Sequence, residues 1–554
     1  MSKPVRNPHG FVLMVALLVL IVMTILGLAF LTISETESRI AFYDRYAKRA
    51  LYVAEMGVER ARRDLKYDAR FDRDGMTNQY FASPTPVAGG SPADCTATIP
   101  WQGLPPQKRC YDLGGPIPTG GFLPLYTNPT LDSFGDGSTY TVLLGLRQSN
   151  KLTIRSEGTG PEGATKVVDV RAEVRDLSVW GNAAFAGGGG SGARINGNVV
   201  IAGSVHILGQ GLGPTGIAAD FGGGAGIFNW YNGLDPIFTG KVPDINPSTL
   251  DAEVRVKEGI VLMNSGAARV GNATSDGVPG GIKLRVDGIY TDYGFAGTYG
   301  DTYVFSDNGT NAKYDVPPDQ PIQFPSLTGP RPDGGVGTYE DYLDANSWDP
   351  VTAGVLPASA VSGSDLRIYA NTASFDVTDG TNRLAWDSIS ETLTVQGIIR
   401  IPGSLTLGGT TGPTQIGTIN YTTGPTGGTF FAKRAGADWS ESGTSGAHQV
   451  SITVNSNLLP LGIYPTAETL GFIAKDRLNM ERSNNSMAAA VFAENQVQII
   501  KQYHVVGAVV SRFLDMGSQV PHLYQMPNLV KYLPPGMPGG EVFNYVKILS
   551  WREL

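Results

Sequence analysis

An uncharged apolar run near the start of the chain restricts what this protein can become more than any other feature. The run extends from Phe11 to Ile33 and follows a short basic leader, MSKPVRNPHG. At about 1.5 Å per residue, a helix of this length spans a bilayer core of roughly 30 Å. A secretory signal peptide has a shorter apolar stretch and then a small-residue cleavage site, whereas here the natural processing point, Gly10–Phe11, precedes the run. A cut there would leave the membrane helix on the mature protein.

The residues after this run predict that the helix continues beyond a membrane. Residues 34–66 contain no Pro and one Gly and are mostly good helix formers. Apolar residues recur at three- and four-residue steps, at Ile40, Tyr43, Ala47, Leu51, Ala54, Val58, Ala61 and Leu65. Acidic and basic residues lie four apart in the pairs Glu35–Arg39, Asp44–Lys48 and Glu59–Arg63. We expect one helix, first suited to lipid and then to packing on a head; the alternative is a membrane anchor with a coiled-coil stalk.

The leader, the junction and the long helix resemble the type IV pilin class, and ALYVAEMGVERARRDL (50–65) resembles the helix of PilX-type minor pilins. The resemblance implies that a prepilin peptidase removes residues 1–10 after Gly10 and that the new amino terminus, Phe11, is N-methylated. It implies a spine helix over 11–66, transmembrane over 11–33, in the inner membrane. The single-pass chain would hold its C-terminal head in the periplasm and reach the pilus and cell surface after assembly. An ordinary signal anchor, with Lys3 and Arg6 keeping the leader in the cytoplasm, is the alternative.

The fifth position after the junction departs from the pattern of major pilins. That class carries a glutamate there, whereas this chain has Val15. A carboxylate in lipid is costly unless it is paired, for instance with the amino terminus of a neighbouring subunit. Among resembling proteins, the absence of this glutamate is characteristic of PilX-type minor pilins and of the tip pseudopilin of type II secretion. With 554 residues, the chain is expected to be a minor or tip subunit and not the repeating shaft subunit.

Composition predicts that most of the remaining chain is β-structure with many tight turns. Gly accounts for 72 residues and Pro for 36, and with 41% apolar and 17% charged residues the chain is not disordered. The expected fold class is α+β or mostly β, with the long helix, a small antiparallel sheet and a large Gly-rich β domain. The net charge of -8 argues against a nucleic-acid partner, because phosphate neutralisation needs a basic face.

The two cysteines of the chain, Cys95 and Cys110, lie in a Pro- and Gly-rich stretch. In an oxidising periplasm a pair this close in sequence is expected to form a disulfide. In the chain-entropy model, closing a loop of about 15 residues contributes roughly 3 kcal/mol. Two free thiols or a two-cysteine metal site are the alternatives.

Residues 67–176 are expected to form a pilin-like head. After an irregular stretch, three runs alternate apolar residues at period two, over 140–146, 152–156 and 168–174. Three antiparallel strands packed on the second half of the helix would make a small head. The run LTIRSEGTGPEGATKVVDVRAEVRD (152–176) also resembles the corresponding stretch of PilX-type proteins.

The domain over 177–554 contains internal repeats that favour a right-handed parallel β-helix. INGNVVIAGSVHILGQGLGPTGI from Ile195 matches VQGIIRIPGSLTLGGTTGPTQI from Val395, with apolar residues alternating in both. KLRVDGIYTDYG from Lys283 is a candidate for a further coil, and long insertions are expected around 211–250 and 296–360. The strand FNYVKILSWREL (543–554) is expected to close the end. A Gly-rich antiparallel sandwich is the competing interpretation.

A second repeat lies near the C-terminus. GFIAKDRLNM (471–480), AVFAENQVQI (490–499) and GAVVSRFLDM (507–516) align without gaps, and their spacing is about the length of one short coil. The alignment places three sets of residues in common columns: Ile473, Phe492 and Val509; Leu478, Val497 and Leu514; Met480, Ile499 and Met516.

No catalytic constellation stands out in the sequence. The histidines do not follow HExxH or another metal-ligand spacing, and His206 alternates with Val205 and Ile207 as an outward-facing strand residue would. Two acidic loops are weak candidates for calcium, through Asp307, Asp315, Asp376 and Asp379. Neither loop follows the EF-hand pattern, and these residues also favour simple turns. The aromatic cluster over 290–305 is either a binding surface or ordinary packing.

These features predict a non-enzymatic minor pilin without a cofactor. Its expected partners are other pilin subunits, the pilus assembly machinery, the prepilin peptidase, the inner membrane and a surface ligand of the head. Its expected role is pilus assembly with surface display and cell adhesion. The alternatives are the tip pseudopilin of type II secretion, whose head is expected to be α/β with a calcium pair, and a membrane-anchored β-helix adhesin or carbohydrate-active enzyme.

Overall fold

The computed structural model of the protein describes most of the chain. It covers residues 8–66, 122–126, 137–148, 151–176, 178–188, 194–195, 197–231, 233–243, 250–273, 283–316, 322–434, 449–499, 501–516, 520–539 and 544–554. The described residues fall into two compact units. Within the described residues, the first unit consists of residues 8–66, 122–126, 137–148, 151–175 and 546–554, and the second consists of those from Asp176 to Tyr545.

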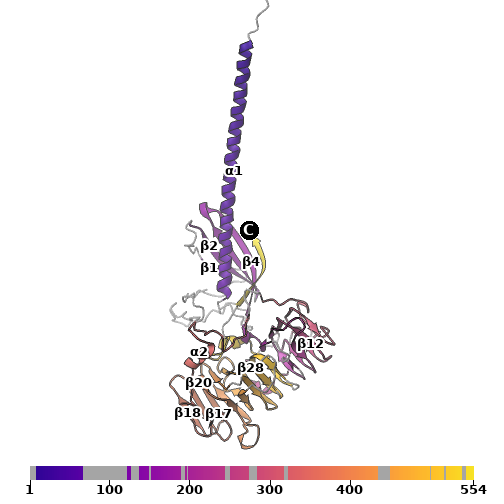
Figure 1. Ribbon diagram of the computed structural model, residues 1–554, viewed down its shortest axis with the longest axis vertical. Coiled ribbons are helices and arrows are strands. Elements are labelled where there is room, and N and C mark those ends of the chain that lie inside the picture. Colours follow the sequence, from indigo (N-terminus) through magenta and orange to yellow (C-terminus); the bar gives the residue numbers. More distant parts are fainter. Residues whose placement is uncertain are drawn as a thin grey trace, which may run out of the picture. The chain divides into compact units, whose positions relative to one another are not determined.

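The first unit consists of one long helix and a five-stranded sheet (Figure 1). Helix α1 spans Pro8–Lys66, as expected for a stretch with no proline after its first turn. The strands lie in the order β1–β2–β3–β4–β31, with bounds Phe122–Tyr126, Thr139–Gln148, Lys151–Thr159, Thr165–Asp176 and Asn544–Glu553. β1 to β4 pair antiparallel, and a short 3-10 helix, Pro161–Gly163, joins β3 to β4. The three predicted strands and their antiparallel pairing are confirmed.

Small residues bring helix α1 into close contact with this sheet. The buried face of the helix consists of Ala50, Val53, Ala54, Val58 and Ala61. A Cβ on Gly158 of β3 would lie 2.3 Å from the Ala50 carbonyl oxygen and 2.4 Å from the Ala54 nitrogen, so the backbones touch there. Of the predicted apolar face, Ile40 and Tyr43 are exposed, because the strands reach the helix only from about residue 46 onward.

The C-terminal strand belongs to the first unit, which corrects the expectation that residues 543–554 close the end of the β domain. β31 lies next to β4, where the Leu554 amide donates to the Val167 carbonyl at 2.9 Å and Lys166 pairs with Glu553. The chain therefore leaves the sheet after β4, forms the second unit and returns to the same sheet. Alternating apolar residues indicate a strand, but they do not specify the sheet that the strand joins.

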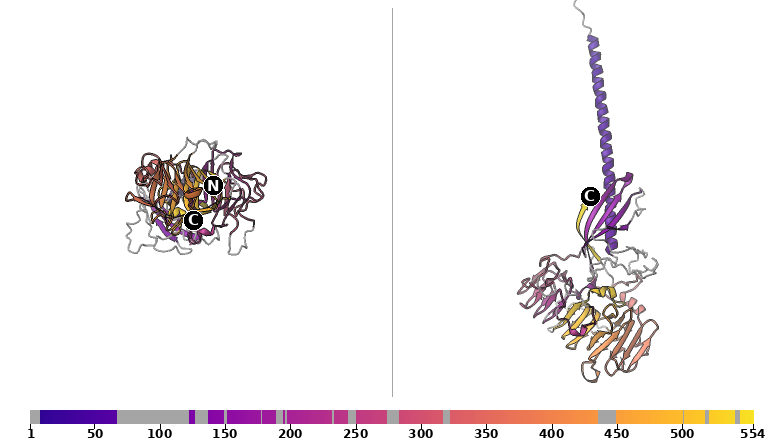
Figure 2. Two further views of the ribbon diagram at one scale, coloured as in Figure 1. Left: turned by 90° about the horizontal axis from the view of Figure 1, so that it is seen from below. Right: turned by 180° about the vertical axis from the view of Figure 1, so that it is seen from behind.

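The second unit is built mainly from short strands (Figure 2). Before the long crossover the strands span Ala184–Gly188 (β5), Arg194–Ile195 (β6), Val200–Ala202 (β7), Val205–Gln210 (β8), Ile217–Phe221 (β9), Gly226–Phe228 (β10), Glu253–Val256 (β11), Ile260–Met263 (β12), Arg269–Val270 (β13), Gly288–Thr291 (β14) and Phe295–Ala296 (β15). After it they span Val361–Ser362 (β16), Asp365–Ile368 (β17), Phe375–Thr378 (β18), Arg383–Asp387 (β19), Thr392–Ile401 (β20), Leu405–Leu407 (β21), Thr418–Thr422 (β22), Gly428–Ala432 (β23), Val450–Val454 (β24), Asn457–Pro460 (β25), Leu470–Ala474 (β26), Arg477–Met480 (β27), Asn485–Ile499 (β28), Tyr503–Asp515 (β29) and His522–Gln525 (β30). The crossover contains helix α2, Tyr339–Asn346.

These strands pair in three parallel ladders. The first runs β14–β11–β8–β5–β29–β28–β26–β23–β20. The second runs β13–β10–β7–β30–β29–β28–β25–β22–β20. The third runs β15–β12–β9–β6–β29–β28–β27–β24–β21–β17. Antiparallel pairing occurs in β16–β17, β18–β19 and β19–β20. Because the three ladders themselves are parallel, the unit differs from the antiparallel sandwich.

The order of the strands in space differs from their order in the chain. The chain starts in the middle of the stack at β5, builds outward to β14 and β15, crosses to the opposite end and builds back through β20 to β30. The last strands then close on the first ones, with Val510 opposite Phe185 and Leu523 opposite Ile201. We call this junction of β29 and β30 with β5 and β7 the seam. Both ends of the unit lie at the seam, since Trp180 Nε1 donates to the Pro538 carbonyl at 2.9 Å.

The predicted repeats correspond to stacked strands, with one error of register. Leu478, Val497 and Leu514 lie opposite one another as aligned. Ile473 lies opposite Phe492, but Phe492 lies opposite Val510 and not Val509. The register shifts by one residue between Ala493 and Gln496, where β28 carries a bulge that a gap-free alignment cannot represent.

The two predicted insertions differ in outcome. Residues 211–250 contain β9 and β10, which pair within the ladders, so that expectation was wrong for residues 217–228, whereas the described residues from 229 to 250 contain no strand. Residues 297–360 contain no strand among those described and form the crossover. The candidate coil from Lys283 is confirmed, because β14 pairs with β11. The glycine-rich turns in 211–250 make the short strands between them resemble loops in the sequence pattern.

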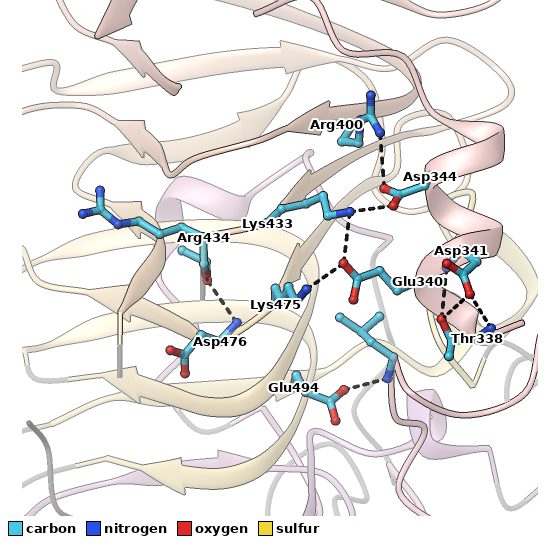
Figure 3. Close-up of polar contacts among 12 residues, drawn as sticks. Thr338, Glu340, Asp341, Asp344, Arg400, Lys433, Arg434, Lys475, Asp476 and Glu494 are labelled. Carbon is cyan, nitrogen blue, oxygen red and sulfur yellow. Dashed lines mark hydrogen bonds and ion pairs between the residues drawn. The ribbon is translucent and has the colours of Figure 1, made fainter. Parts of the chain in front are cut away.

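Charged side chains fasten the crossover to the outside of the ladders (Figure 3). Glu340 of α2 bonds to Lys475 at 2.7 Å and Lys433 at 3.0 Å, and Asp344 pairs with Lys433 and Arg400. Burial by itself lowers the pKa of Lys433, but hydrogen bonds to Asp344 and Glu340 raise that pKa above its ordinary value. The crossover is therefore a packed part of the unit.

We expect Gly158→Ala to push helix α1 off the sheet, because the added Cβ meets backbone atoms that cannot move aside. The substitution should destabilise the helix–sheet contact by roughly 1–3 kcal/mol, as overpacking does. Faster amide hydrogen exchange in β3 and in residues 50–61 would report the loss. Gly417→Ala is the matched control, since a Cβ at Gly417 meets no atom within 4 Å. Equal exchange in the two variants would contradict the close contact.

A pair of histidines near the seam links the stability of the second unit to pH. His504 of β29 and His522 of β30 lie with ring centroids 4.4 Å apart, and Asp235, Ser486 and Tyr524 surround them. Burial lowers the pKa of His504, with Asp235 opposing the shift. Burial, and then His504, lowers the pKa of His522 to about 4. Both imidazoles are therefore neutral in the folded protein near neutral pH.

Since the folded-state pKa of each histidine lies below the unfolded value of about 6.5, protonation favours unfolding, and stability falls as pH drops from about 6.5 towards 4. Thermal unfolding at pH values at the two ends of this window measures the loss. His522→Gln removes one titrating group, so its melting temperature should fall less between the two pH values than that of the parent. An equal or larger fall in the variant would contradict this role.

Candidate functional site: the exposed apolar half of helix α1

The first half of helix α1 presents apolar side chains on every side. The large apolar residues from Val12 to Ile33 are all exposed within the described chain, and by length and composition the segment can cross a membrane. Its polar hydroxyls are satisfied inside the helix: Thr24 Oγ1 donates to the Leu20 carbonyl at 2.7 Å and Thr32 Oγ1 to the Leu28 carbonyl at 2.6 Å. A surface of this kind is stable only in lipid or against other apolar helices.

The sequence-predicted site residues lie at the start of this surface. Helix α1 begins at Pro8, so Gly10 and Phe11 lie in its first turns, and Val15 is 45% exposed on the apolar surface. The position that holds a glutamate in major pilins therefore carries an apolar side chain on the outside of the helix. Cleavage after Gly10 and methylation of Phe11 remain predictions.

Charged pairs mark where the apolar surface ends. Arg39 bonds to Glu35 at 2.6 Å and Lys48 bonds to Asp44 at 2.7 Å, as the sequence predicts. The hydrogen bond to Asp44 raises the pKa of Lys48. Both pairs are exposed and contribute little to stability. They indicate that this part of the helix lies in water, between the apolar surface and the part that packs on the sheet.

The four carboxylates considered for calcium have other partners. Asp315 binds Arg255 through both oxygens, at 2.9 and 3.3 Å. Asp376 likewise binds Arg383, and Asp307 pairs with Lys283. Asp379 accepts hydrogen bonds from the backbone amides of residues 381 and 382, as a turn residue does. Among the residues that the structure describes, no group of three or more metal-ligating side chains is found.

The other predicted residues either pack inside the second unit or lie outside the described residues. Cys95 and Cys110 lie outside the described residues. His206 faces away from the inner core that holds Val205 and Ile207, as predicted, but it is buried: its Nε2 contacts Tyr314 Oη at 2.8 Å, and burial, followed by Arg255, lowers its pKa to about 3. In the aromatic cluster, Tyr290 is buried beneath the Arg255 guanidinium, which favours packing.

Comparison with known proteins gives a family match over helix α1. Residues 9–59 match the model of the PilX N-terminal family, and the match ends within helix α1. In the solved structures, the chain is similar to the competence-associated pilin ComZ from Thermus thermophilus, with 19% identity and a TM-score of 0.48, over 92% of this chain and 97% of that chain. No curated protein matches. Helix α1 is therefore similar to the N-terminal helix of PilX-type proteins over residues 9–59, and it suits membrane anchoring as in pilins.

We expect Leu20→Arg to release much of the chain from membranes, because a charge at the centre of a spanning helix costs roughly 2.5–3.5 kcal/mol. Fractionation of cells into membrane and soluble material measures the effect. Ile40→Arg is the matched control: its side chain is 62% exposed and that of Leu20 is 66% exposed, but it lies beyond the apolar run. Equal retention of both variants in the membrane would contradict the assignment.

Proposed function

We propose that the protein is a minor, tip-associated type IV pilin that inserts in the inner membrane and is processed by a prepilin peptidase between Gly10 and Phe11. The observation that supports this most is the family match over residues 9–59, combined with an apolar helical half that is exposed throughout. Packing of this half against the helices of other subunits would place the chain in the fibre. Val15 suits a subunit that does not need the glutamate link of the shaft.

The second unit would then be the displayed part, a right-handed parallel β-helix that carries adhesion. The three parallel ladders and the shared inner core support the β-helix. Right-handedness is supported by the strong preference of parallel strand connections for that hand. The unit is inserted between β4 and β31, so the small sheet would remain a pilin head over 67–176 that is completed by the C-terminus. A disulfide between Cys95 and Cys110 would suit the periplasm.

Processing can be tested with Gly10→Val in cells that contain the prepilin peptidase. The parent should yield an N-methylated peptide that starts at Phe11, and it should occur in sheared surface fibres. The variant should keep Met1 and stay in membranes. His9→Val, which leaves the junction intact, is the control. A parent protein that keeps Met1 and never enters sheared fibres would contradict the proposal and reduce the chain to a signal-anchored β protein.

A further inference from the structure

A lysine, an aspartate and an asparagine converge near the end of the stack that β13 to β15 form. Asp287 Oδ1 accepts hydrogen bonds from Lys283 Nζ at 2.6 Å and from Asn229 Nδ2 at 2.8 Å. Asn229 follows β10 and is completely buried, whereas Lys283 and Asp287 precede β14 and are partly buried. One carboxylate oxygen therefore holds an amine and a carboxamide next to each other.

The carbonyl group of the same asparagine is also held. Asn229 Oδ1 accepts hydrogen bonds from the backbone amides of Leu250 at 3.1 Å and Ala252 at 2.8 Å. Two backbone donors directed at one carbonyl oxygen polarise the carbonyl and stabilise the negative charge that develops when a nucleophile adds to its carbon. The site thus combines a nucleophile, a proton carrier and an activated amide.

We propose that Lys283 and Asn229 form an intramolecular isopeptide bond with Asp287 as the proton carrier. The Lys283 ammonium passes a proton to Asp287, and the free amine attacks Asn229 Cγ. Asp287 then gives its proton to Nδ2 as the Cγ–Nδ2 bond breaks, and the ammonia that leaves takes up the second proton, which the attacking nitrogen loses. The side-chain ammonium and the carboxamide become a secondary amide and an ammonium ion, and Asp287 ends as a carboxylate, so no oxidant or co-reactant is needed.

Asp307 opposes this reaction. Its Oδ2 lies 2.6 Å from Lys283 Nζ. Burial by itself lowers the pKa of Lys283, but hydrogen bonds to Asp287 and Asp307 raise that pKa above its ordinary value. The amine is mostly protonated at neutral pH, so the bond forms slowly and its rate increases with pH. Fixed orientation offsets the low fraction of free amine, because held groups react as if at very high concentration.

The bond would join two neighbouring coils near one end of the stack, where stabilisation has the most effect. Within the described residues, β15 pairs with another strand on one side only, and β13 and β14 have on their outer side only isolated bridges and hydrogen bonds to residues 303–312. Terminal coils of a solenoid lack a neighbour and open first. The bond joins the turn before β14 to the turn after β10, and residues 177–554 contain no cysteine that could form a disulfide there.

Tryptic peptide mapping of the full chain, denatured before digestion, tests this directly. We expect peptides 195–241 and 270–285 to be joined in one branched peptide that is lighter than their sum by one ammonia and is uncleaved after Lys283. Lys433, which pairs with Glu340 and Asp344, is the matched control and should be cleaved normally. Two separate peptides with full cleavage after Lys283, from protein kept at mildly alkaline pH, would overturn the proposal.

Two aspartate variants separate the chemistry from simple proximity. Asp287→Ala keeps the lysine and the asparagine but removes the proton carrier, so no branched peptide should form. Asp307→Asn should retain the branched peptide and form it faster. A branched peptide at parental yield in Asp287→Ala, or its absence in Asp307→Asn, would contradict the assigned roles. The peptide map of the parent decides whether the bond exists even if a variant does not fold.

Discussion

The contact of helix α1 with β3 holds one half of a continuous helix on a sheet and leaves the other half uncovered. Ala50 and Ala54 approach Gly158 so closely that no side chain fits between the backbones. Nothing comparable covers residues 12–33 within the described chain, where the large apolar side chains are exposed. Because the helix is unbroken, the docked half fixes the direction in which the apolar half leaves the sheet. A membrane or neighbouring helices must supply the missing contacts.

The second unit is added to this arrangement without interrupting helix α1 or strands β1 to β4. The second unit is inserted between two strands of the first unit's sheet, and its two ends meet at the seam, where Trp180 bonds to Pro538 and Gln525 bonds to Gly181. A stack of this size needs neighbours for every coil. The chain meets this need by building outward from the seam to one end of the stack and then back to the seam from the other end, with the crossover packed on the outside, where Phe324 stacks on Phe492. A large β unit can thus be inserted into a small sheet.

Local sequence pattern predicted the parts of the fold that depend on neighbours along the chain. The single helix, the three strands over 140–174 and the repeated coils all follow from periodicity. The partner of the C-terminal strand, the closure of β29 on β5 and the bulge at residues 494–495 depend on contacts across hundreds of residues, which periodicity does not encode. The same division applies to the side chains of interest: the apolar run is evident in the sequence, whereas Asn229 meets Lys283 and Asp287 only when neighbouring coils are stacked.

Labelling of single cysteines along helix α1 tests the division of the helix most directly. In a chain with both native cysteines changed to serine and inserted in lipid vesicles, Leu20→Cys, Ile40→Cys and Ala54→Cys sample lipid, water and the sheet contact. A water-soluble maleimide should label the cysteine at position 40 rapidly and those at positions 20 and 54 slowly, and detergent should expose position 20 alone. Rapid labelling at position 20 in vesicles, or at position 54 in the folded protein, would contradict the account.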